Sequence, residues 1–314
     1  MSRVKRILSI DGGGVRGIYA AHILALIEEQ LPEPLYRYFD LIAGTSTGGI
    51  IALGISLGFS AASIVQFYEK YSKSIFGGWR TRRFLRHLIR HKYDRAPLEA
   101  ALKETFGDLL IDSCKTRILI PSMNVETGQV HVYKTCHRED FNRDFHRPIY
   151  EAALATSAAL TYFPNYINST ADILTDGGMW ANNPTLFSLV EALGLLKWER
   201  TELRALSVGC INRSFENAAR GRWGIIGLFW SRPVDLFLGM QSQAALSASN
   251  TLIGSKNVFR LNDTGDYDID DYKKLEEMKI LADARFRTEW SRLQNVFFSE
   301  LVEEPFIPYN RPTQ

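Results

Sequence analysis

Two short apolar runs near the start of the chain each end in a glycine-rich turn that leads into a helix-like segment. Residues 7–10 precede a turn with three glycines at 11–14, and the apolar spacing over 18–31 is helical. Residues 39–48 repeat the pattern and lead into a helix of small residues over about 49–58. This succession predicts an α/β fold, in which both glycine turns meet at the carboxyl edge of a parallel sheet.

Three further strands are expected later in the chain. Residues 116–123 and 204–209 read as buried strands, and 130–134 alternates like a half-exposed one. Strands interleaved with helices predict a three-layer α/β/α sandwich around a largely parallel central sheet. No internal repeat or flexible linker divides the 314 residues, so we expect one domain.

The composition narrows the class of protein. With 46% hydrophobic and 23% charged residues the chain reads as soluble and globular, and a net charge of +2 gives no global attraction to DNA, RNA or anionic membranes. Three cysteines without a C-x-x-C pair predict buried thiols in a reducing cytoplasm.

The uncharged stretch 41–68 is long enough to cross a bilayer. Its five glycines and its serine and threonine residues are untypical of a membrane helix. We therefore expect a buried strand, a glycine turn and a buried helix.

Residues 44–48 read Gly-Thr-Ser-Thr-Gly, which fits the Gly-x-Ser-x-Gly pattern. In that pattern a serine is presented on a tight, strained turn between a buried strand and a helix. The apolar strand before and the small-residue helix after are the expected context, so Ser46 is the candidate nucleophile. The alternative is a loop in which Thr45 or Ser46 only caps the helix.

A serine nucleophile needs a base, and none of the six histidines lies beyond His146. The α/β-hydrolase order would therefore crowd acid and histidine between Ser46 and His146. Asp176, which is followed by two glycines, is the other candidate. A buried aspartate can accept the hydroxyl proton directly when desolvation raises its pKa. Asp-Gly-Gly is also a common turn sequence.

Residues 11–17 read Asp-Gly-Gly-Gly-Val-Arg-Gly. Consecutive glycines at a helix start expose backbone amides where the helix dipole favours negative charge. Gly12, Gly13 and Gly14 are therefore candidate oxyanion donors. Arg16 is expected to steady this loop or to contact a phosphate.

The same segment matches Gly-x-Gly-x-x-Gly, the dinucleotide-binding fingerprint. A Rossmann fold would then require an acid at the end of the second strand, but Asp40 stands at the start of its strand. A nucleotide-binding sensor without hydrolase activity remains the alternative from another functional class.

Taken together, the blocks at 11–17, 44–48 and 176–178 resemble the patatin-like phospholipases in order and spacing. The likeness continues through shorter blocks at 151–159, 162–164, 182–184 and 206–209. It implies a Ser46–Asp176 dyad that hydrolyses fatty acyl esters of phospholipids through an acyl-enzyme, without metal or organic cofactor. It also implies a catalytic domain at 1–262, with 263–314 as a helical extension packed on the same domain.

Within that family the chain resembles the cyclic-oligonucleotide-activated phospholipases of bacterial antiphage systems. The likeness implies a cytoplasmic enzyme that acts peripherally at the inner membrane when a cyclic di- or oligonucleotide activates it. Phospholipid and membrane surface are the implied partners, DNA and RNA are not, and a homo-oligomer is compatible with the likeness.

A basic segment lies between residues 79 and 95. Its arginines include Arg82, Arg83, Arg86 and Arg90. On a helix, three of these four lie on one face, which suits membrane headgroups or ligand phosphates. An ordinary solvated face explains the pattern equally well.

Residues 223–240 are rich in aromatic and aliphatic side chains. Such a segment could form a mobile lid or line an acyl-chain groove. Ordinary core packing is the alternative.

Overall fold

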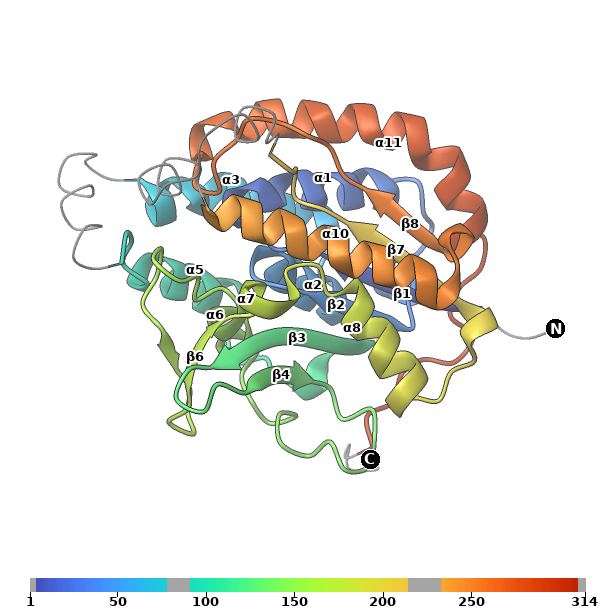
Figure 1. Cartoon of the computed structure of the whole chain (residues 1–314), viewed down its shortest axis with the longest axis horizontal. Helices are drawn as coiled ribbons and strands as arrows, with labels where there is room; N and C mark the ends of the chain where they lie inside the picture. The colour runs from blue at the N-terminus through green and yellow to red at the C-terminus, as the bar shows by residue number, and fades with distance from the viewer. Residues whose placement is uncertain (1–3, 78–90, 214–232, 310–314) are drawn as a thin grey trace.

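The computed structural model describes residues 4–77, 91–213 and 233–309, and within these ranges eight strands form one mixed sheet (Figure 1). The strands are β1 (Lys5–Ile10), β2 (Leu41–Gly44), β3 (Arg117–Asn124), β4 (Val130–Lys134), β5 (Tyr166–Ile167), β6 (Ile173–Asp176), β7 (Leu203–Val208) and β8 (Val258–Leu261). Their order is β5-β6-β3-β2-β1-β7-β8, with β4 also paired to β3. Strands β3, β2, β1, β7 and β8 are parallel neighbours, which confirms the largely parallel sheet.

The antiparallel strands gather around β3. Strand β4 pairs with Leu119–Met123, and β6 pairs with Ser122–Asn124, both antiparallel. Because β4 occupies one edge of β3, β2 and β6 must share the other edge, where β2 pairs with Arg117–Leu119. Strand β2 runs parallel to β3 and β6 runs antiparallel to it, so the carboxyl ends of β2 and β6 point at each other. Pro121, which has no N–H to donate, lies in the gap between them.

Helices cover both faces of the sheet, as the alternation of side chains along β1 shows. Leu8 and Ile10 belong to one apolar core and Ile7 to another. The helices packed in the first core are α1 (Gly17–Glu28), α2 (Thr47–Leu57), α3 (Ala61–Phe76), α5 (Ala96–Phe106), α6 (Ile149–Thr156) and α11 (Leu275–Phe297). The second core is closed by α8 (Thr185–Val190) and α10 (Pro233–Ile253). The expected three-layer sandwich is confirmed.

The uncharged stretch 41–68 contains β2 and α2, as expected, and also the first half of α3, which was not predicted. In the described part of the chain, no helix combines the length and apolar character needed to span a bilayer. The three cysteines Cys114, Cys136 and Cys210 are buried and free, as predicted.

Helix α11 runs along the edge of the molecule over α1 (Figure 1). Its Phe297 is fully buried, and its ring contacts the rings of Phe39 and Phe259 at centroid distances of 6.2 and 5.1 Å. The last helix thereby packs both on Phe39, two residues before β2, and on strand β8.

Replacing Phe297 with alanine should lower the free energy of unfolding by about 3–5 kcal/mol, because it removes a large buried ring and leaves a cavity. Chemical denaturation measures the loss. Ile280, 65% exposed on the same helix, gives the control Ile280→Ala, which should change stability by about 0.5 kcal/mol or less. Equal effects of the two substitutions would contradict the packing described for α11.

Candidate active site

Ser46 lies on a sharp turn between β2 and α2. Its backbone has φ 55° and ψ −124°, a region that side-chain-bearing residues rarely occupy. A Cβ on Gly44 would overlap the Gly48 carbonyl, and a Cβ on Gly48 would overlap the Ile10 carbonyl, so the turn requires both glycines. The Ser46 side chain makes no capping bond to α2, so the helix-cap alternative does not hold for its hydroxyl.

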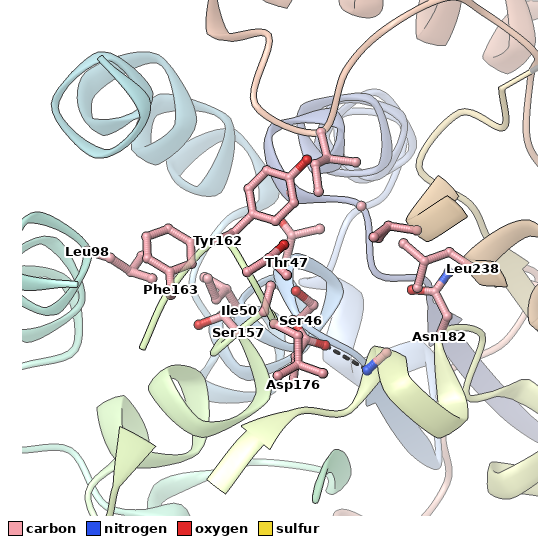
Figure 2. Close-up of a pocket in the computed structure, with 18 of the residues that line it drawn as sticks. Ser46, Thr47, Ile50, Leu98, Ser157, Tyr162, Phe163, Asp176, Asn182 and Leu238 are labelled. Carbon is pink, nitrogen blue, oxygen red and sulfur yellow. Dashed lines mark hydrogen bonds between the residues drawn. The ribbon is translucent and has the colours of Figure 1, made fainter. Parts of the chain in front are cut away.

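Asp176 ends β6 and meets Ser46 across the gap beside Pro121. Figure 2 shows the two side chains next to each other at the centre of the pocket. The Ser46 hydroxyl lies beside the Asp176 carboxylate, which accepts a hydrogen bond from the Gly178 amide at 2.6 Å. Burial raises the pKa of Asp176 to about 6, and the interactions with the Ser46 hydroxyl and the Gly178 amide partly oppose that rise. The carboxylate is thus a stronger base than an exposed aspartate.

Thr156 of α6 fixes the position of the turn relative to β3. Its hydroxyl donates to the Pro121 carbonyl at 2.5 Å and accepts from the Ser46 amide at 2.9 Å. The Ser46 amide is therefore occupied, and the backbone of the turn is tied to β3 through Thr156.

The glycine loop lies beside Ser46, but its three glycines differ. The Gly12 amide donates to the Asn182 carbonyl at 3.0 Å. Gly13 and Gly14 line the cavity at Ser46, and neither of their amides donates to another group of the described chain. Gly14 has φ +59°, and a Cβ there would overlap the Ile269 carbonyl. The amides of Gly13 and Gly14 are thus available at the cavity, whereas the Gly12 amide is already bonded, and the oxyanion role of these glycines stays a prediction.

An ion pair that we did not predict, between the buried Asp11 and the half-buried Arg260, anchors this loop. Asp11 pairs with Arg260 of β8 through two contacts of 2.8 and 2.6 Å and accepts a hydrogen bond from Ser242 of α10 at 3.1 Å. One feature of the sequence could have indicated this pair: Arg260 is the one charged residue in the otherwise apolar strand β8. Its partner, 249 positions earlier, could not be read from local pattern.

Arg16 is buried and supports the loop from behind. Its Nε donates to the Gly13 carbonyl at 3.3 Å, and its guanidinium pairs with Asp235 of α10 at 3.1 Å. Arg16 does not line the cavity that contains Ser46. Of the two roles expected for it, loop support agrees with these contacts.

The site opens into a cavity of about 450 Å³ with an apolar lining (Figure 2). The lining includes Ile50, Phe67, Ile75, Leu98, Phe163 and Leu238. A volume of this size is typical of small-molecule sites. The described residues that line it include no histidine, and the described part of the chain contains no cluster of side chains able to hold a metal ion.

The structure describes the aromatic segment 223–240 only in part, and it does not describe the four arginines of the basic segment. Residues 233–240 of the aromatic segment begin α10, and Val234, Phe237 and Leu238 line the cavity. Residues 223–232 lie outside the described residues, as do Arg82, Arg83, Arg86 and Arg90.

Comparison with known proteins agrees with this geometry. The family model for patatin-like phospholipases matches residues 8–188. A cGAMP-activated phospholipase of Pseudomonas aeruginosa is 32% identical over 310 residues, which cover 96% of this chain and 91% of the relative. A cGAMP-activated phospholipase of Vibrio cholerae is 34% identical, covering 77% and 73%. A cUMP-AMP-activated phospholipase of Escherichia coli is 34% identical, covering 65% and 64%.

The α/β/α fold and the apolar cavity beside the serine turn agree with a hydrolase. The chain belongs to the patatin-like phospholipase family, which confirms the resemblance seen in the sequence and the expected enzyme class. Family membership decides against the dinucleotide-binding interpretation of residues 11–17.

Substitution of Asp176 by asparagine should stabilise the protein in a pH-dependent way. Because the folded state holds the Asp176 proton more tightly than the unfolded chain, stability is lost as pH rises from about 4 to 6. Asp176→Asn removes this loss. The free energy of unfolding of the variant should exceed that of the native protein by up to about 3 kcal/mol above pH 6. Below about pH 4 the two values should be equal.

Urea denaturation across this pH range measures the difference. Asp108→Asn, on an exposed turn, is the control and should change stability by no more than about 0.5 kcal/mol. If Asp176→Asn were less stable than the native protein at neutral pH, the result would contradict the conclusion that burial raises the pKa of Asp176.

Proposed function

We propose that this chain hydrolyses fatty acyl esters of phospholipids with Ser46 as nucleophile and Asp176 as base. The Ser46 oxygen attacks the acyl carbonyl carbon while Asp176 takes the hydroxyl proton. The amides of Gly13 and Gly14 receive the oxyanion. Asp176 then returns the proton to the leaving alcohol, and the acyl group stays on Ser46. A water molecule attacks the acyl-enzyme in the same manner and releases the fatty acid.

One observation carries the proposal: a hydroxyl on a strained turn lies beside a buried carboxylate whose pKa is raised to about 6. A base with this pKa is mostly ionised at neutral pH and yet accepts a proton more readily than an exposed aspartate. The family's activity and the apolar cavity beside the dyad both agree with an acyl ester as substrate.

Exposed apolar side chains around the cavity support action at a membrane surface. Phe237 and Met179 are 60% and 48% exposed, and both line the cavity, as do the exposed Leu160 and Val234. Apolar side chains gathered at a pocket mouth are typical of a surface that meets another apolar phase. We therefore place the phospholipid substrate in a membrane that the enzyme touches peripherally, at the cytoplasmic face of the inner membrane.

The proposal includes control by a cyclic nucleotide in antiphage defence. It is supported by relatives described as cGAMP-activated and cUMP-AMP-activated phospholipases, the first of which matches nearly the whole chain. We also propose that residues 1–262 form the catalytic domain and that residues 263–314 form an extension packed on it, since α11 packs on α1.

Ser46→Ala should reduce fatty acid release from phosphatidylethanolamine and phosphatidylglycerol vesicles by at least about a thousandfold, because it removes the attacking oxygen. Fatty acid is quantified by mass spectrometry with cGAMP present. Ser74→Ala, an exposed serine of α3, is the control and should release fatty acid at the native rate. A fluorophosphonate should label the native protein once, on Ser46. Undiminished hydrolysis by Ser46→Ala would leave the nucleotide-binding sensor as the better hypothesis.

A cyclic dinucleotide should increase the native rate by at least about tenfold, the size of an ordinary allosteric coupling. The measurement is vesicle hydrolysis with cGAMP, cUMP-AMP, cyclic di-GMP or no nucleotide. Ser46→Ala should still bind the activating nucleotide in calorimetry, since the nucleophile is not expected to hold it. Equal rates with and without all three nucleotides would reject this part of the proposal.

A further inference from the structure

The cavity that contains Ser46 ends at a wall that it shares with a second cavity. The main cavity has a volume of about 450 Å³ and the second about 300 Å³. Ile50 and Phe67 line both. Their side chains are almost completely buried, so within the described structure these two residues separate the main cavity from the second one.

Helix α3 presents one row of side chains to each cavity. The row at the main cavity is Tyr68, Ser72, Ile75 and Phe76. The row at the second cavity is Ser63, Ile64, Gln66, Lys70 and Tyr71. Phe67 stands between the rows and contributes to both, as its place on a helix of 3.6 residues per turn requires.

Helix α2 leads from the nucleophile to the wall and past it. Ser46 precedes the helix, Ile50 lies one turn further, and Gly54 lies two turns further and lines the second cavity alone. At 1.5 Å per residue, Gly54 is about 12 Å along the helix from Ser46. An acyl chain that has its carbonyl at Ser46 and follows α2 therefore reaches the wall and, beyond it, the second cavity.

The second cavity is apolar inside and polar at its rim. Phe59 and Phe106 stack on each other at a centroid distance of 5.9 Å and line it together with Ile64. The exposed ion pair Lys70–Glu104, at 2.8 Å, lies at the outer rim. Methylene groups would lose contact with water inside, which favours a hydrocarbon chain by burial of apolar surface.

We propose that the second cavity receives the distal methylene groups of long fatty acyl chains and that Phe67 sets the acyl-chain length the enzyme prefers. Chains that end before the wall fill the main cavity alone. Longer chains bind only when the Phe67 ring moves out of the shared wall. The inference rests on the proposed acyl-ester hydrolysis and adds to it the residue that selects among substrates.

Phe67→Ala should join the two cavities and shift the preference toward long chains. The kcat/KM values are measured for the p-nitrophenyl esters of octanoate, laurate, palmitate and stearate. The ratio of kcat/KM for the stearate ester to kcat/KM for the octanoate ester should rise by at least about tenfold, because each additional buried methylene favours binding. Phe67→Leu, which retains more of the core, should shift the ratio in the same direction to a smaller extent. An unchanged ratio in both variants would overturn the proposal.

Two further variants separate joining the cavities from simple enlargement. Phe163→Ala enlarges only the main cavity and should change the ratio by less than about threefold. Ser63→Phe, one turn before residue 67 on α3, should fill the second cavity and cancel the gain of Phe67→Ala in the double variant. The proposal would also be overturned if Phe163→Ala raised the stearate-to-octanoate ratio as much as Phe67→Ala does. It would be overturned too if the double variant kept the raised ratio of Phe67→Ala.

A binding measurement distinguishes failure of this inference from failure of the proposed hydrolysis. In the Ser46→Ala background, Phe67→Ala should tighten the binding of cis-parinaric acid by about tenfold in a fluorescence titration. This readout needs no turnover. Absence of hydrolysis by the native protein would reject the proposed function, whereas unchanged fatty acid affinity would reject the role of Phe67.

Discussion

The meeting of Ser46 and Asp176 depends on how two strands divide one edge of β3. Strand β2 occupies the first part of that edge and runs with β3, while β6 occupies the last part and runs against it. Their carboxyl ends therefore approach each other over Pro121. This brings together Ser46, which follows β2, and Asp176, which ends β6. In an entirely parallel arrangement the two carboxyl ends would point in the same direction. The short antiparallel margin of the sheet is thus what brings Ser46 and Asp176 together.

The glycine loop at residues 11–17 is held by groups from distant parts of the chain. Arg260 of β8 neutralises Asp11 at its start, and Arg16 ties the Gly13 carbonyl to Asp235 of α10. The Ile269 carbonyl accepts a hydrogen bond from the Val15 amide at 2.8 Å. A buried charge is tolerated only when it is paired and hydrogen-bonded, so these contacts stabilise the loop as a set. Loss of one partner would leave an uncompensated charge beside the site.

Local motifs made much of the site predictable. The turn at Ser46 is recognisable because its glycines, its strand and its helix are neighbours in the sequence, and the same holds for Gly13, Gly14 and the Asp176 turn. The antiparallel course of β6 was not predicted, since four residues carry too weak a period to reveal a direction. The partners Arg260 and Asp235 were missed for a related reason. Their contacts with the loop join residues far apart in the sequence, and only the folded chain brings them together.

Much of the support for the active site comes from residues that follow the part matched by the family model, which ends at residue 188. Asp235, Arg260 and Ile269 hold the glycine loop, and Phe237 and Leu238 line the cavity. Asp270, next to Ile269, is paired with Lys92 at the entrance to α5. Any movement of α10 or of the 263–271 loop would therefore also shift the contacts that support Gly13 and Gly14. The positions of Ser46 and Asp176 depend instead on β2 and β6, so the glycine loop and the Ser46–Asp176 pair are held by different parts of the fold.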